Sequence, residues 1–305
     1  MLYPLSYGGE SQPSGFPAVV APCQHVPMTP VTVRTALVRE VGCAVDGVLG
    51  EPAALVLAIA VADGEGLSRS ERLRVAVDGR ALDVAEHPGP VGTRWHTVDA
   101  PAGVLRVEYE AMVRGRARPA TVTPLERILD VRPSRFVQSD ILPALVDSEV
   151  VRAFADLPPL DRLGAVREAV SGALEYSWGS TRPTDGLAEP LEAGAGVCRD
   201  FAHVVAGLLR ATDLPARVVS VYAPGLDPMD FHAAVEVAVG DEWLLVDATG
   251  RAPRRTMVRI ATGRDAADTA FLASDGSALA LTAVRVRAEA NDPSPERPSE
   301  LVALG

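Results

Sequence analysis

Alternating apolar and polar positions dominate the first third of the chain, from about Thr29 to Val113. Short runs rich in β-branched and apolar residues are separated by turn residues, and Asp78-Gly79 stands between two of the alternating runs. An Asp-Gly pair flanked in this way is a strong β-hairpin signal. The pattern predicts a small β-sandwich-like, β-rich domain over residues 29–115.

The hydrophobic period changes after a proline-rich connection at 114–147. Apolar residues recur at helical spacing in 148–157 and 161–178, and again after Gly196. Strand patterns then resume in three apolar segments, at 216–224, 231–240 and 242–250. The order of these patterns predicts an α+β protein in which a second domain, over 116–290, packs helices on an antiparallel sheet.

The two ends of the chain differ from the patterned middle. Residues 1–28 are rich in Pro, Gly and Ser, and 291–305 are rich in Pro, Ser and Glu. This composition predicts a disordered N-terminal extension and a flexible C-terminal tail. Because patterned sequence begins only after Met28, we expect Met28 rather than Met1 to be the true start.

Charge and cysteine content exclude several classes of function. The net charge of −11 argues against nucleic acid as a partner, which needs a basic face. No apolar run is long enough to cross a bilayer, and no basic run suggests a membrane surface. The three cysteines, Cys23, Cys43 and Cys198, are far apart and form no CxxC, so neither a disulfide framework nor a cysteine zinc site is expected. A cytoplasmic location follows as the simplest expectation, and the oligomeric state stays open.

Cys198 is the cysteine with a chemically suggestive setting. It follows Gly194 and Gly196 and falls in the first turn of an amphipathic helical pattern. Unpaired N–H groups and the helix dipole favour the thiolate form of a cysteine there. Position alone leaves two interpretations open, since a single cysteine in an apolar helix is usually a small buried hydrophobe.

A histidine and an acid follow on two strands that are expected to pair. If Gly240-Asp241 form the turn, Ala234 faces Asp247, and His232 lies on the same face as Asp247 one diagonal step away. If the turn is centred on Val239-Gly240, His232 and Asp247 are directly opposite. Both registers bring the two side chains together on one face.

These three residue types together are typical of nucleophilic acyl transfer. The Cys198 thiolate attacks an acyl carbon, His232 holds and delivers the proton, and Asp247 orients the imidazole. The backbone N–H of Cys198 supplies one donor to the oxyanion. Candidates for the second donor and for substrate contacts are three residues: Trp178, Tyr176 and Arg199.

The sequence resembles the bacterial members of the transglutaminase-like superfamily. The residues that carry the resemblance are GAGVCRDFAHVVAGLLRATDLPARVVSVY, DFHAAVEVAV and WLLVDATG, with Ala248 where the family commonly has proline. The resemblance implies a papain-like core with Cys198 as nucleophile, His232 as general base and acid, and Asp247 as orienting carboxylate. It implies no calcium dependence, and no cofactor is expected.

The expected function is acyl transfer through a thioester on a peptide or glutamine-type amide, with hydrolysis favoured over cross-linking. A catalytically inactive binding module is the main alternative. A metal site built from Cys198, His203 and His232 is a weaker one, because a cysteine and a histidine five residues apart on one helix converge poorly on an ion. His203 is expected to be structural, and Asp200 is expected to complement the helix dipole.

Overall fold

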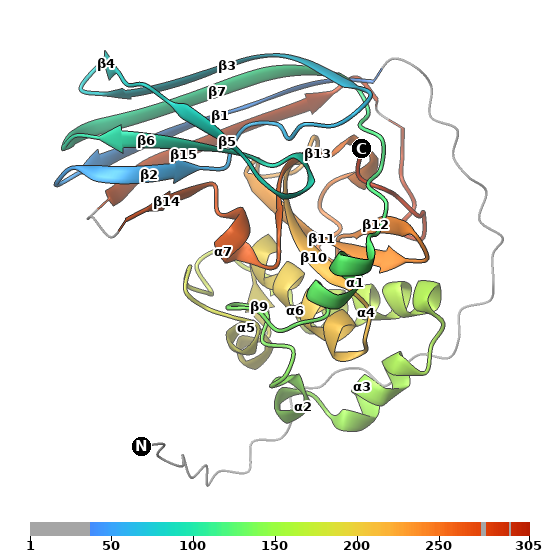
Figure 1. Cartoon of the computed structure of the whole chain (residues 1–305). Coiled ribbons are helices and arrows are strands. Elements are labelled where there is room, and N and C mark those ends of the chain that lie inside the picture. The colour runs from blue at the N-terminus through green and yellow to red at the C-terminus, as the bar shows by residue number, and fades with distance from the viewer. Residues whose placement is uncertain (1–36, 276–278, 293) are drawn as a thin grey trace, which may run out of the picture.

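The computed structural model describes residues 37–275, 279–292 and 294–305. The predicted extension at 1–28, with Cys23 and the choice between Met1 and Met28, lies outside the described residues. The fold is α+β, as the sequence pattern predicts, with long strands at one end of the molecule and helices at the other (Figure 1). In the described ranges, no helix combines the length and apolar character that crossing a bilayer requires.

Two antiparallel sheets form the β-rich end, and their inward side chains share one apolar core that includes Leu55, Val98 and Val107. The first sheet has the order β15-β1-β7-β3-β4, with the bounds Leu279–Ala290, Val38–Leu49, Gly103–Gly115, Leu67–Val77 and Arg80–Ala81. The second has the order β14-β2-β6-β5, with the bounds Leu272–Ser274, Ala53–Leu57, Arg94–Ala100 and Ala85–Pro88.

The Asp-Gly turn predicted from the sequence is present between β3 and β4. Val77 pairs with Arg80, which leaves Asp78 and Gly79 as a two-residue loop. Both loop residues have positive φ, 49° and 77°. A two-residue turn with positive φ at both positions has a backbone twist that matches the twist of the flanking strands. Asp-Gly favours this turn, so the hairpin forms at Asp78-Gly79.

A third antiparallel sheet lies between the sandwich and the helices (Figure 1). Its order is β12-β11-β10-β13, with the bounds Glu242–Val246, Phe231–Val239, Ala216–Tyr222 and Val258–Gly263. On one side it packs against α6 (Cys198–Ala211), whose Val204, Val205 and Leu208 are fully buried. At the end of β10, Tyr222 enters the core of the sandwich together with Ile260 of β13, so the two parts of the molecule share packing.

Several of the remaining elements pack against α6. The longest is α4 (Pro159–Ala173), which packs against α6 through Val166 and Val170. Two short parallel strands, β8 (Glu175–Tyr176) and β9 (Ala195–Gly196), lie just before α6. The short helices are α1 (Pro124–Leu129), α2 (Leu142–Leu145), α3 (Ser148–Ala155), α5 (Ala188–Ala193) and α7 (Ala266–Thr269), with 3-10 turns η1 (Pro90–Gly92) and η2 (Arg254–Thr256).

The predicted domain division differs from the observed pairing at its C-terminal boundary. The region 116–290 was expected to lie wholly in the second domain, but β15 pairs with β1 along its length, with Val284 opposite Val45, and β14 pairs with β2. The β-rich part is therefore closed by strands from the far end of the chain. Strand pairing between such distant segments leaves no local signal.

The predicted flexible tail at 291–305 is also corrected over its described residues. The carbonyl of Val302 accepts a hydrogen bond from the backbone N–H of Leu245 at 2.7 Å, and the Leu304 side chain is buried beside Leu245. Glu296 pairs with buried Arg254 at 2.6 Å. Backbone pairing and apolar burial fix this segment against β12 despite its polar composition.

Candidate active site

Cys198 is the first residue of α6, as predicted, and its side chain is half-buried. The turn before it is closed by Asp200, whose carboxylate accepts a hydrogen bond from the Val197 backbone N–H at 2.8 Å. Gly196 leaves room for this carboxylate, since a Cβ at that position would lie 2.6 Å from the Asp200 Cβ. The acid is thus both a helix cap and, as expected, a charge at the positive end of the dipole.

The β11–β12 hairpin brings His232 and Asp247 together. Val239 pairs with Glu242, so Gly240-Asp241 form the loop and the first of the two predicted registers is the observed one. The same register places Asp247 just past the end of β12, on the face that carries His232. The Nε2–H of His232 donates a hydrogen bond to Oδ2 of Asp247 at 2.8 Å.

Burial and pairing set the charges of this couple. Burial alone would lower the pKa of His232, but the Asp247 carboxylate and the Cys198 side chain outweigh it and raise the pKa to about 10. Burial would likewise raise the pKa of Asp247, and the charge of His232 with hydrogen bonds from Thr249 holds it below its usual range. At neutral pH the pair is therefore an imidazolium and a carboxylate.

The sulfur of Cys198 lies beside this pair. Its S–H points at the carbonyl oxygen of Phe231, at 3.8 Å, and Phe231 directly precedes His232. Nε2 of His232 is engaged by Asp247, and Nδ1 is buried without a hydrogen-bond partner. Since the Cys198 side chain acts on the pKa of His232, Nδ1 is the ring nitrogen available to exchange a proton with the thiol.

Of the two predicted oxyanion donors, Tyr176 is the one that the structure brings to the cysteine. The pairing of β8 with β9 places Tyr176 beside Gly196. Burial and the charge of Cys198 raise the pKa of Tyr176, while a hydrogen bond from the Cys198 backbone N–H to its hydroxyl opposes the rise. Trp178 is 56% exposed and meets the Tyr176 ring edge-on, with ring centroids 6.1 Å apart.

Arg199, the third predicted substrate contact, is already engaged by its neighbours. Its guanidinium donates to Oδ1 of Asp200 at 2.7 Å and to the Thr181 hydroxyl at 3.0 Å. Thr181 in turn donates to the other oxygen of Asp200 at 2.5 Å. Arg199 therefore helps to hold the start of α6, a role that sequence reasoning did not assign.

His203 lies apart from the reactive groups. Its Nε2 accepts a hydrogen bond from the Ala266 backbone N–H at 3.2 Å, and its ring stacks on Phe136 at 5.9 Å. Burial lowers the pKa of His203 to about 4, so the ring is neutral. Among the described residues, no group of three or more His, Cys, Asp or Glu side chains is placed to hold a metal ion, including the set Cys198, His203 and His232.

Two functional neighbours were missed from the sequence. Thr249 donates both its backbone N–H and its hydroxyl to Oδ1 of Asp247, each at 2.8 Å, and an Asp-x-Thr turn is a local signal that could have shown this. The second is Arg251, whose guanidinium lies 4.4 Å from the centre of the Tyr176 ring. No sequence pattern joins those two residues.

A cysteine-led helix packed on an antiparallel sheet, with a histidine and an acid on adjacent strands, defines the papain-like class of fold. Residues 149–248 match the family model described as the transglutaminase-like superfamily. This stretch of the chain therefore matches a transglutaminase-like domain, as the resemblance in the sequence indicates.

Solved structures of other proteins are similar to this chain. A crystal structure from Cytophaga hutchinsonii, described as a candidate cysteine protease, is 27% identical, covers 86% of this chain and 93% of its own, and superposes with a TM-score of 0.75. The periplasmic domain of TgpA from Pseudomonas aeruginosa is 19% identical, with coverage of 72% and 89% and a TM-score of 0.39. LapG from Legionella pneumophila is 19% identical, with coverage of 44% and 72% and a TM-score of 0.27. None of the curated proteins compared with the chain matches it.

Proposed function

We propose that the protein is a cysteine-dependent acyl-transfer enzyme that acts on a peptide or glutamine-type amide and passes the acyl group to water. The observation that carries the proposal is the buried His232–Asp247 pair, joined at 2.8 Å, beside the thiol that begins α6. The likeness to a candidate cysteine protease supports hydrolysis over cross-linking.

Acylation uses the imidazolium form of His232. The Cys198 thiolate attacks the amide carbon, and a C–S bond forms while the carbonyl oxygen becomes an oxyanion. The oxyanion collapses, the C–N bond breaks, and Nδ1–H of His232 gives its proton to the leaving amine. Asp247 keeps Nε2 protonated throughout, so the proton leaves from the nitrogen that faces the substrate.

Deacylation runs through the same groups. Neutral His232 takes a proton from water at Nδ1, and the resulting hydroxide attacks the thioester carbon. The C–S bond then breaks, and Cys198 leaves as the thiolate beside the restored imidazolium. An amine in place of water gives a new amide by the same steps, so selection between the two rests on which nucleophile the cleft admits.

The oxyanion is stabilised from the start of α6. The backbone N–H of Cys198 is one donor, and the hydroxyl of Tyr176, which the β8–β9 pairing places beside Gly196, is the second. This assignment chooses Tyr176 over Trp178, whose exposed indole is better placed to line the route of the substrate.

The test is acyl transfer to water and to an added amine. The wild type, Cys198→Ala and His232→Ala are incubated with glutamine peptides and peptide amides, with and without n-pentylamine, and the products and intact proteins are followed by mass spectrometry. We expect wild-type turnover mainly to the free acid, and none in either variant. Pentylamide as the main product would identify a cross-linking enzyme instead. A thiol that forms no acyl adduct, and that iodoacetamide alkylates no faster than free cysteine, would favour a binding module.

A further inference from the structure

We propose that Arg251 is a positioning residue for acyl transfer, which holds the Tyr176 ring against the start of α6 from the same turn that orients Asp247. The inference rests on the proposed function, because it concerns the oxyanion side of that reaction. It joins two halves of the site that come from segments about 70 residues apart in the sequence.

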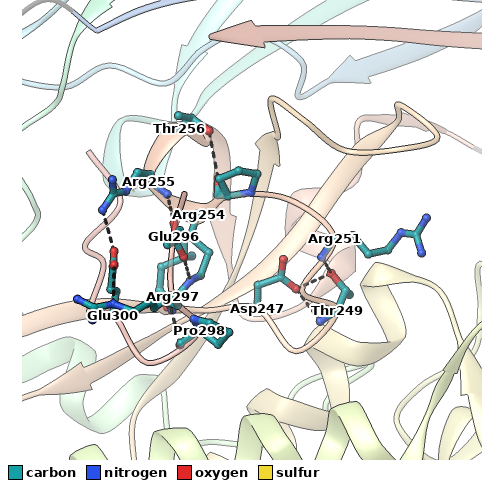
Figure 2. A network of polar contacts seen from close by, with 12 residues as sticks. Asp247, Thr249, Arg251, Arg254, Arg255, Thr256, Glu296, Arg297, Pro298 and Glu300 are labelled. Atoms are coloured by element: carbon teal, nitrogen blue, oxygen red, sulfur yellow. Dashed lines mark hydrogen bonds and ion pairs between the residues drawn. The ribbon is translucent and has the colours of Figure 1, made fainter. Parts of the chain in front are cut away.

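One end of the connection is the turn after β12. Thr249 donates to Asp247 through its backbone N–H and its hydroxyl, and the same hydroxyl accepts from the Arg251 backbone N–H at 3.3 Å. Figure 2 shows the Arg251 side chain leaving this turn on the side away from the ion pair of Arg254 with Glu296. The geometry of the acid and the direction of Arg251 are therefore fixed by one residue, Thr249.

The other end is the Tyr176 ring. The Arg251 guanidinium lies over this ring, 4.4 Å from its centre, and donates a hydrogen bond to the backbone carbonyl of Asp227. A cation over an aromatic face is attracted by the ring, more strongly where water is displaced. Because the carbonyl of Asp227 holds the Arg251 guanidinium in place, the guanidinium fixes the plane of the Tyr176 ring.

Few other groups can hold the ring in place. Its backbone is tied to β9 through the hydrogen bond from Ser177 N–H to the Gly196 carbonyl, at 2.9 Å. Its ring packs against the apolar core and meets two aromatic rings, Phe201 and Trp178, at centroid distances of 6.0 and 6.1 Å, and these contacts carry no charge or hydrogen bond. The guanidinium of Arg199, the residue after Cys198, forms an ion pair with Asp200 instead. In the described part of the chain, Arg251 is the cation recorded over Tyr176.

Two reactions of the same thiol separate this role from a general structural one. Iodoacetamide alkylates a thiolate by displacement at carbon and forms no oxyanion, so its rate reports the Cys198–His232 pair. p-Nitrophenyl acetate acylates the thiolate through a tetrahedral oxyanion and releases p-nitrophenolate, so its rate also reports the oxyanion donors. The ratio of the two rates isolates the oxyanion side of the site and requires no knowledge of the natural substrate.

The experiment compares second-order rates of acylation and alkylation of Cys198 in the full chain. We expect Arg251→Met to lower acylation about tenfold with alkylation within twofold of the wild type. Arg251→Lys should keep most of the acylation rate, because it keeps the cation. Tyr176→Phe should show the same selective loss, and Arg251→Met added to it should cause little further loss. The control is Arg287→Met, on an exposed arginine of β15, which should leave both rates unchanged.

The outcomes separate the two proposals. A wild type with no Cys198-dependent release of p-nitrophenolate overturns the proposed function, and this inference with it. A wild type that is acylated, with an unchanged ratio in Arg251→Met or equal loss of both rates, overturns the inference alone. Fully additive losses in the double variant do the same, because they would show that Arg251 does not act through Tyr176.

Discussion

Of two buried histidines in this protein, one is charged and the other is neutral, and their partners decide which. His232 faces the Asp247 carboxylate, which raises its pKa to about 10 against the effect of burial. His203 is equally buried but accepts a hydrogen bond from a backbone N–H, so burial dominates and lowers its pKa to about 4. The histidine proposed as the proton donor is thus kept charged, and the histidine that packs in the core is kept neutral.

The neutral histidine predicts a loss of stability in acid. The folded-state pKa of His203, about 4, lies below the unfolded value of 6.5, so the unfolded chain binds the proton first. The stability is complete above pH 6.5 and falls as the pH drops toward 4. His203→Gln keeps an acceptor for the Ala266 N–H but cannot titrate. From pH 7 to pH 4 the free energy of unfolding of the wild type should fall by about 3 kcal/mol more than that of the variant.

Chemical denaturation at several pH values measures this difference. If the free energy of unfolding depends on pH in the same way in the wild type and in His203→Gln, His203 does not change its protonation on unfolding. If the free energy of unfolding of the wild type instead rises relative to that of the variant as the pH falls, the buried ring is charged in the folded state.

At the scale of elements, local turns could be predicted and distant partners could not. The Gly240-Asp241 turn fixed the β11–β12 register, and the Asp78-Gly79 turn fixed β3–β4, because both depend on adjacent residues and a side-chain period of two. That register sufficed to place His232 with Asp247. The stacking of Arg251 on Tyr176 depends on β8 meeting the turn after β12 in space, which no local pattern specifies.

The start of α6 gives a prediction at this scale. Gly196→Ala would drive a Cβ to 2.6 Å from the Asp200 Cβ, so the carboxylate must leave the Val197 N–H. Overpacking of this kind costs about 1–3 kcal/mol and would displace Cys198, so we expect lower stability and at least tenfold slower acylation by p-nitrophenyl acetate. The matched control is Gly164→Ala inside α4, where a Cβ meets nothing within 4 Å. It should raise stability by about 0.5–1 kcal/mol and leave acylation unchanged.

Thermal or denaturant unfolding, together with the acylation rate, tests both glycines. If Gly196→Ala and Gly164→Ala change the stability and the acylation rate equally, Gly196 does not make room for the Asp200 cap.

At the scale of the whole molecule, the described C-terminal segment joins its two parts. β15 returns to pair with β1, and Glu296 in the segment after it pairs with Arg254 (Figure 2). Arg254 also donates to the carbonyl of Leu245 at 3.0 Å, two residues before Asp247. The sandwich and the third sheet are also joined directly. The Tyr222 hydroxyl donates to the Ile59 carbonyl at 2.7 Å, and the Thr262 N–H donates to the Thr93 hydroxyl at 3.0 Å.

This shared packing predicts that damage at the junction destabilises the molecule as a unit. Gly92 ends η1 at φ 76°, and a Cβ there would overlap the carbonyl of Asp63. The backbone N–H of Asp63 donates a hydrogen bond to the carbonyl of Gly92 at 2.8 Å. Gly79 has a nearly identical φ of 77°, but a Cβ there meets nothing within 4 Å. Gly79→Ala should therefore cost only the backbone strain, about 1–2 kcal/mol, whereas Gly92→Ala should cost roughly 2–5 kcal/mol.

The measurement is denaturant unfolding followed by both circular dichroism and tryptophan fluorescence, since Trp95 lies in β6 and Trp243 in β12. We expect Gly92→Ala to shift both transitions together, because η1 lies where the sandwich meets β13. Two separated transitions would show instead that the parts unfold independently. An equal cost at the two glycines would mean that the clash with Asp63 relaxes without loss, and that the junction is not the rigid contact on which this argument depends.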